Sequence, residues 1–293
     1  MLGKLIIRNL KLYFRDKVAV FFSMLSVLIV VVLFVLFLAQ LQVDSITETA
    51  PGIDKTKIAF LVHSWILGGL LSLTTVTSVL GGYGTLVNDR YKKIYMSFKS
   101  APIKPWIYPL SHILSACIIG VVVSLTAVAV YLPCIRLLCG FRLSVETLLL
   151  AVALILFSSL VSSLFCGCIC SFLKTTTAFS SVSILVGTCL GFINGLYVPL
   201  GSLNQTIVDV LNFFPSLHIA AIFRKILTRD AIQAVFENAP AGIVADYMEQ
   251  YGLTLRFRNA AVDADTSVIY ALCFGLVCAI VMVIRLKRKN EEI

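Results

Sequence analysis

Apolar residues in this chain occur in long blocks, and these blocks constrain the fold more than any other feature of the sequence. Each block approaches or exceeds the roughly 20 residues that a helix needs to cross about 30 Å of hydrocarbon. Of the 293 residues, 59% are hydrophobic and only 13% are charged, which excludes a water-soluble globular protein. The blocks do not alternate as barrel strands do. The predicted fold class is therefore an all-α integral membrane protein.

Six transmembrane helices are predicted. They cover Val18 to Leu41, Ile58 to Leu86, Trp106 to Ile135, Thr147 to Phe172, Ala178 to Pro199 and Ser267 to Ile284. The first block is too long for the core of a signal peptide, and no small-residue cleavage site follows it. It is therefore kept as a membrane helix.

Lysines and arginines predict the orientation of the chain, because short loops rich in these residues stay cytoplasmic. With six spans, both termini lie on one side of the membrane. That side carries the basic residues of both termini and of the 87–105 stretch. The short loops opposite hold only Lys55, Lys57, Arg136 and Arg142. Both termini are predicted to be cytoplasmic and the long 201–266 segment to be external. The cysteine-rich spans and the basic cytoplasmic face fit a bacterial plasma membrane.

Motifs of catalysis and metal binding are missing from the sequence. It contains no Gly-x-x-x-x-Gly-Lys-Ser/Thr phosphate loop, no Gly-x-Ser-x-Gly elbow and no His-Glu-x-x-His helix. The nine cysteines and three histidines lack metal-ligand spacing; for example, Cys166, Cys168 and Cys170 alternate between the faces of a helix. No span holds an acidic residue well inside it, which disfavours proton-driven transport. We expect no catalytic residue, no metal site and no nucleotide site in this chain.

The amino terminus, MLGKLIIRNLKLYFRDK, has helical periodicity. Lys4, Arg8, Lys11 and Arg15 recur at helical steps, and apolar residues fill the other side. This pattern predicts an amphipathic helix in the cytoplasmic interface with its basic face outward. The helix could dock an energy-supplying partner, or it could anchor the chain to anionic lipids, and the two roles are compatible.

The 87–105 stretch, VNDRYKKIYMSFKSAPIKP, is the largest cytoplasmic loop between predicted spans. Asp89 is expected to cap a short helix from Tyr91 to Lys99, and Pro102 and Pro105 to end it before the third span. A short charged helix on such a loop suits the docking of a partner. The alternative is a loop that only determines topology.

Glycines recur in the fifth predicted span. Gly187, Gly191 and Gly195 follow one another at steps of four. Such a face of small residues allows close approach of helices, either within the chain or between two copies.

Hydroxyl groups cluster in the second predicted span. Ser72, Thr75 and Ser78 lie on roughly one of its sides, and Asn194 lies beside the glycine face of the fifth span. These four residues are candidates for lining an uncharged pathway. Alternatively, the serines and threonine bond their own helix backbone.

The 201–266 segment is too long for a simple connector. Helical spacing predicts helices over Gln205 to Phe214, Asp230 to Phe236 and Ala241 to Tyr251, and TLRFRNAAVDADTS reads as an irregular or strand-like return. We expect partly re-entrant helices that form an external gate.

The order of these features resembles the permease subunits of ABC-2 type exporters, the type V exporter transmembrane domains. The resemblance covers essentially the whole chain. It includes RNLKLYFRDK before the first span, the loop ending in KSAPIKPW, and LYVPLGSLNQTIVDVLNFFPSLHIAAIFRKIL after the fifth span. One departure lies in the loop. The family often has an acid, a Lys or Arg and a Gly-Thr pair there, whereas this chain has Asp89 and Arg90 followed by Tyr91, Lys92 and Lys93.

The resemblance implies that residues 1–293 form one transmembrane domain, with 1–17 as interfacial helix and 87–105 as coupling loop. It implies a permease that dimerises with a second copy or a paralogue. ATPase subunits that bind ATP and Mg would dock on the amino-terminal helix and on the loop. The coupling candidates are Asp89, Arg90, Lys92, Lys93, Lys99, Pro102, Arg8, Lys11 and Arg15.

The family resemblance also implies that the second and fifth spans line the route of an exported amphipathic, peptide, drug or lipid-like substrate. No binding to nucleic acid is expected. Two other functions stay open at this point. An ion- or proton-coupled secondary transporter is disfavoured by the lack of intramembrane acids and of an internal repeat. A membrane assembly factor or membrane-embedded enzyme lacks any catalytic cluster of residues.

Overall fold

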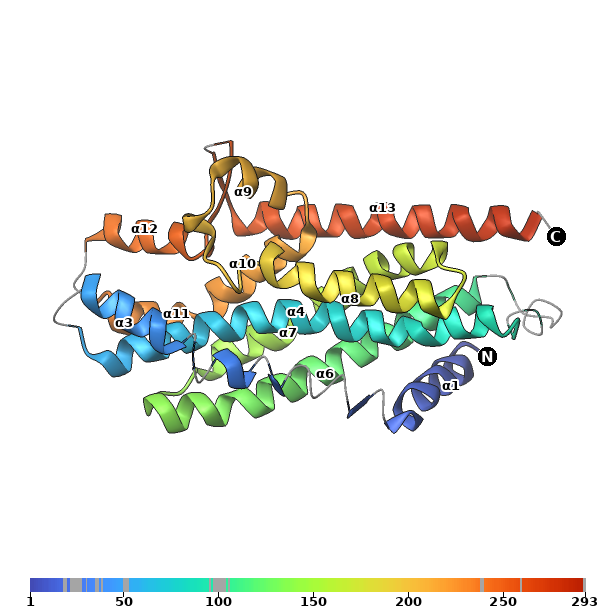
Figure 1. The fold of residues 1–293 in the computed structure, drawn as a ribbon, viewed down its shortest axis with the longest axis horizontal. Coiled ribbons are helices and arrows are strands. Elements are labelled where there is room, and N and C mark those ends of the chain that lie inside the picture. Colours follow the sequence, from blue (N-terminus) through green and yellow to red (C-terminus); the bar gives the residue numbers. More distant parts are fainter. Residues whose placement is uncertain are drawn as a thin grey trace.

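The computed structural model describes residues 1–17, 20–21, 28–29, 31–34, 37, 39–49, 53–94, 96, 104, 106–237, 240–258 and 260–291. Long helices run along a common axis in Figure 1. Half of the first predicted span, Val18 to Leu41, lies outside the described residues. The helix α3 (Ala39–Thr49) begins near its predicted end.

Five helices in the described part of the chain are long and apolar enough to cross a membrane, which confirms a helical membrane protein. They are α4 (Lys55–Tyr91), α6 (Ile107–Cys139), α7 (Val145–Phe172), α8 (Thr176–Ile193) and α13 (Ala264–Glu291). They correspond to the second to sixth predicted spans. Both α4 and α6 are longer than predicted, and α8 ends at Ile193 rather than at Pro199.

The ends of these helices follow from side chains that bond the free backbone groups of the first or last turn. Asp54 accepts a hydrogen bond from the Thr56 N–H of α4 at 2.9 Å, and Ser144 accepts one from the Thr147 N–H of α7 at 3.2 Å. At the other end, Gly140 closes α6 with a φ of 75°, a left-handed conformation that favours glycine.

The helix α4 is the core of the molecule. It packs against α6, α7, α8 and α10 and lies at the centre of Figure 1. Because α4 is buried on nearly all sides, its polar groups need partners inside the protein. The Tyr83 hydroxyl donates to the Ser163 carbonyl at 2.8 Å, and His63 Nδ1 lies 3.1 Å from the Tyr131 hydroxyl.

The segment between α8 and α13 is mostly helical. It contains a 3-10 turn η2 (Leu200–Ser202), α9 (Gln205–Leu211), α10 (Pro215–Leu227), α11 (Arg229–Val235), α12 (Ala241–Gln250) and an antiparallel hairpin of β1 (Leu255–Phe257) and β2 (Ala260–Val262). Three predicted helices and the strand-like return are confirmed. The helix α10 was not predicted, although a proline at the first helical position is typical of a helix start.

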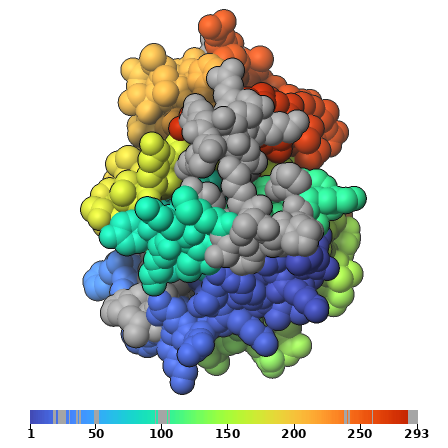
Figure 2. Space-filling model, turned by 90° about the vertical axis from the view of Figure 1, so that its right-hand side faces the viewer, coloured from blue at the N-terminus to red at the C-terminus, as the bar shows by residue number. Residues whose placement is uncertain are grey.

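The helices α9 and α10 meet at a bend of 100°. Figure 1 shows α9 beside the amino-terminal end of α13, and α10 packs against α4. The helix α1 (Leu2–Arg15) and the end of α13 lie at the same end of the molecule. Figure 2 views that end, where α1, in blue, covers the lower part of the face.

Candidate functional site

A bidentate ion pair joins α1 to the end of α4. Arg8 Nη1 donates to Asp89 Oδ2 at 2.7 Å, and Arg8 Nη2 donates to Asp89 Oδ1 at 2.8 Å. The Asp89 side chain is 3% exposed and that of Arg8 is 27% exposed. These hydrogen bonds raise the pKa of Arg8 above its usual value, so the Arg8 guanidinium is charged at all physiological pH values. Two parallel charged hydrogen bonds fix the orientation of α1 on α4.

Polar side chains of α1 and α6 surround this ion pair. Asn9 Nδ2 lies 3.4 Å from both Ser111 Oγ and His112 Nδ1. The Tyr108 hydroxyl donates to Asp89 Oδ2 at 3.4 Å. Three helices that are distant in sequence therefore meet in one buried polar cluster.

The prediction that all four basic residues of α1 face outward is wrong for Arg8. Lys4, Lys11 and Arg15 are exposed, whereas Arg8 turns towards Asp89 and its neighbour Asn9 is buried. The polar cluster between α1, α4 and α6 compensates the burial of these groups.

The prediction that Asp89 caps a short helix is also wrong. Asp89 lies inside α4, which continues to Tyr91. Arg90 Nη1 donates to the carbonyls of Cys170 at 2.9 Å and Ser171 at 3.2 Å, at the carboxyl end of α7. A cation there satisfies carbonyl groups that have no partner within the helix.

The remaining coupling candidates lie on the surface or outside the described residues. Lys92 and Lys93 are exposed directly after α4, where Lys93 turns the chain with a φ of 56°. Lys99 and Pro102 lie outside the described residues. The structure thus separates the candidates into internal groups, Asp89 and Arg90, and surface lysines.

The candidate pathway residues are all buried within the single chain. Asn194 Nδ2 donates to Ser72 Oγ at 3.1 Å, and Ser72 Oγ donates to the Ser216 carbonyl at 3.0 Å. This short chain of bonds connects α8, α4 and α10. Thr75 and Ser78 instead donate to carbonyls of their own helix, at 3.0 Å and 2.5 Å. Their role in a pathway stays a prediction.

The three glycines of the predicted packing face have different surroundings. A Cβ on Gly187 would meet nothing within 4 Å, whereas one on Gly191 would overlap the Tyr197 ring. Gly195 lies beyond the end of α8 with a φ of 61°. There the Leu196 N–H donates to the Gly191 carbonyl at 3.0 Å, an arrangement that stops a helix. Gly195 therefore ends α8 and does not extend its packing face.

The sequence predicts no role for Arg224, a buried arginine of α10. Arg224 is 0% exposed, its guanidinium lies 4.6 Å from the centre of the Trp65 ring, and Nη2 donates to the Gly195 carbonyl at 2.9 Å. Cation–π contact and a helix-terminal carbonyl replace the acidic partner that a buried arginine usually has. An arginine within the apolar stretch HIAAIFRKIL, and the Gly68-Gly69 pair facing it, are the sequence signals of this site.

Comparison with known proteins agrees with the arrangement of helices. A family model for the ABC-2 type transporter matches residues 2–228, which is more than half of the chain. No curated protein matches the chain. The match begins in α1 and ends directly after α10, so it includes the ion pair, the coupling candidates and Arg224. The chain therefore belongs to the ABC-2 type transporter family and is a multi-pass membrane permease component of an ABC transporter.

Proposed function

We propose that this protein is the permease subunit of an ATP-driven exporter in the plasma membrane of a bacterium. It crosses the membrane six times, with residues 18–41 as the first span and both termini in the cytoplasm. ABC-2 permeases generally work with ABC ATPase partners, and this chain contains no phosphate loop of its own. ATP and Mg bind to the partner.

The ion pair between Arg8 and Asp89 is the observation that carries this proposal. It makes α1 and the end of α4 one unit, and that unit bears the exposed side chains of Lys11, Lys92 and Lys93. A force applied to these lysines by an ATPase passes directly into α4, the helix that contacts most of the others. Lys99, Pro102 and Arg15 complete the docking surface in this proposal.

The pathway runs along α4 and α8. The bonds among Ser72, Asn194 and the Ser216 carbonyl join these helices to α10 in this conformation. When they separate, uncharged hydroxyl and amide groups become available to an amphipathic, peptide, drug or lipid-like substrate. The sharply bent pair α9 and α10 acts as a re-entrant external gate, which is supported by the bend of 100°.

A second permease copy or paralogue completes the pathway. The exposed apolar face of α8, with Ile184 at 71% and Leu185 at 63% exposed, supports this part of the proposal. The open space beside Gly187 permits close approach of another helix. Cross-linking in membranes that yields only single copies would contradict it.

Affinity purification of the tagged protein in mild detergent, followed by an ATPase assay, tests the proposed function. We expect a soluble ATPase to co-purify. Changing Lys92, Lys93 and Lys99 together to Ser should lower both its recovery and its activity, because these charges form the docking surface. The matched control changes Lys225, Arg256 and Arg258 to Ser, which removes the same charge from the predicted external segment, residues 201–266.

An intact chain that purifies without any ATPase would contradict the proposal and favour a secondary transporter. If the ATPase binds the triple variant and the wild type equally, the proposal of an ABC permease stands. The 87–105 stretch is then not part of the docking surface.

A further inference from the structure

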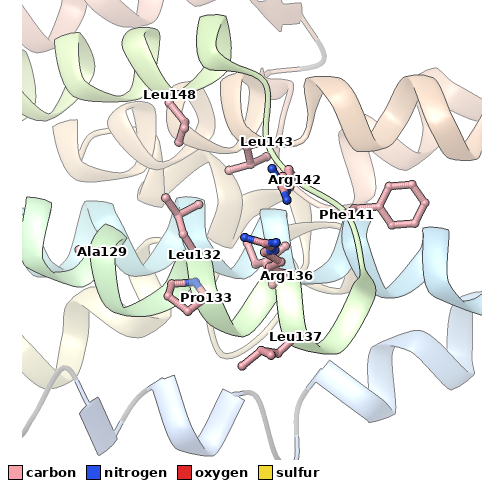
Figure 3. A pocket seen from close by; sticks show the side chains of 10 residues that line it. Ala129, Leu132, Pro133, Arg136, Leu137, Phe141, Arg142, Leu143 and Leu148 are labelled. Carbon is pink, nitrogen blue, oxygen red and sulfur yellow. The ribbon is translucent and has the colours of Figure 1, made fainter.

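A pocket of about 690 Å³ lies at the turn between α6 and α7, at the end of the molecule opposite to α1. Figure 3 shows Arg136 on the last turn of α6 and Arg142 on the following loop, with apolar side chains around them. Leu132, Pro133 and Leu148 form part of the apolar lining. The pocket therefore combines a long apolar wall with two cations.

Neither arginine forms an ion pair within the part of the chain that the structure describes. The nearby acids have other partners. Glu146 pairs with Arg229 at 2.7 Å, and Asp230 accepts hydrogen bonds from the amino end of α7, the shortest at 2.8 Å. Two positive charges thus share one pocket without an acid of the protein to neutralise them. Such an arrangement favours an anionic ligand.

A tight turn and packed side chains hold the pocket in shape. Gly140 turns the chain sharply, and the ring of Phe141 stacks on that of Phe60 with centroids 5.1 Å apart. Leu143, between the turn and α7, is 7% exposed. Pro133 has no N–H group, so the carbonyl of Ala129, which also lines the pocket, lacks its usual helical donor. A hydroxyl group of a ligand can supply that donor.

The position of the pocket identifies the source of the anion. Both α6 and α7 are long and apolar enough to span a membrane, so their connecting turn is expected at the membrane boundary. Leu137, Val145 and Leu149 beside the turn are 85%, 74% and 67% exposed, as expected for side chains in contact with lipid. A phospholipid is the molecule that has a phosphate at this depth and an acyl chain next to it.

We infer that this pocket binds one anionic phospholipid. Its phosphate contacts Arg136 and Arg142, and the start of an acyl chain lies along Leu132 and Leu148. Two cations require a headgroup with net negative charge, so phosphatidylglycerol is bound in preference to phosphatidylcholine. The inference is independent of the cargo and of the ATPase partner.

Native mass spectrometry of the full-length protein in mild detergent tests this inference. Phosphatidylglycerol and phosphatidylcholine with the same acyl chains are added at equal concentration. We expect the wild type to retain about 30-fold more phosphatidylglycerol, since each of the two arginines contributes about fivefold to binding of an anionic headgroup. Arg136→Gln with Arg142→Gln should abolish the preference. Lys55→Gln with Lys57→Gln, which removes the same charge at the same end of the molecule, should preserve it.

Ala129→Phe fills the pocket without changing its charge and should lower retention of both lipids while the protein stays folded. This variant keeps the test decisive if the double arginine variant does not fold. Equal retention of the two lipids by the wild type would overturn the inference. It would also be overturned if the double lysine variant lost the preference as fully as the double arginine variant does. Displacement of the lipid by excess inorganic phosphate would assign the site to a free phosphate and also overturn it.

Discussion

Single residues decide how the amino-terminal helix is placed. Periodicity correctly predicts that residues 2–15 are helical and that Lys11 and Arg15 are exposed. It fails at Arg8, because the partner that turns this side chain inward lies 81 residues later. Local patterns identify helices and caps, whereas a contact with such a distant residue leaves no periodic signal. The prediction that Asp89 caps a short helix fails for the same reason.

Asp89→Asn should lower the free energy of unfolding of the purified protein by about 1.5–3 kcal/mol, the usual contribution of a hydrogen bond to a charged group. The reason is that Arg8 loses its charged acceptor while it stays partly buried. A double-mutant cycle with Arg8→Gln measures the coupling, and Lys11→Gln serves as control because Lys11 is exposed. Additive effects of the two substitutions would show that the ion pair does not stabilise the fold.

How closely two helices approach each other depends on the glycines at their contact. A Cβ on Gly68 of α4 would lie 2.8 Å from the backbone N of Arg224, so α4 and α10 are in backbone contact there. In the sequence, Gly68 and Gly187 are both glycines in apolar helices. The sequence predicts the five long helices, with their ends displaced by several residues, but it misses α10. It does not show which glycine faces another helix, because that depends on how the helices rotate about their axes.

Gly68→Ala should destabilise the protein by about 1–3 kcal/mol, the usual cost of overpacking a core. The backbone of α10 would have to move away from α4 and carry Arg224 with it. Gly187→Ala is the matched control, since open space surrounds it and alanine is the better helix former by about 1 kcal/mol. Thermal unfolding in detergent measures both. Equal losses at the two positions would contradict the close approach of α4 and α10.

The whole molecule is polarised along its length. Within the part of the chain that the structure describes, the basic residues of α1 and Arg90, Lys92 and Lys93 at the end of α4 lie at one end of the molecule, and the predicted external helices α9, α11 and α12 lie away from it. Counting apolar spans and basic loop residues predicts this layout, because membrane insertion and the retention of basic loops both act on whole segments. The bend between α9 and α10 was beyond such reasoning, since it depends on how Pro215 starts a second helix after α9 ends.

Labelling of single cysteines in a cysteine-free background should reveal this polarity in cells. A cysteine at Lys93 should be protected from an impermeant maleimide added outside, and one at Gln205 should react. Along α9, Val208→Cys should react more slowly than Val210→Cys, since Val208 is 8% exposed and Val210 is 56% exposed. Uniform reactivity from Leu203 to Phe214 would contradict a re-entrant gate. Reaction at Lys93 would reverse the predicted orientation.

The burial of α4 has a consequence for biogenesis. Trp65 Nε1 donates to the carbonyl of Tyr251 at 2.7 Å, across 186 positions of sequence. Synthesis proceeds from the amino terminus, so α4 enters the bilayer long before Tyr251 has been translated. Until then the Trp65 indole N–H and the Ser72 hydroxyl, which donates to the Ser216 carbonyl, lack their final partners in a medium that offers few others. The nascent protein therefore depends on the insertion machinery, or on transient helix neighbours, to shelter α4 until nearly the whole chain has left the ribosome.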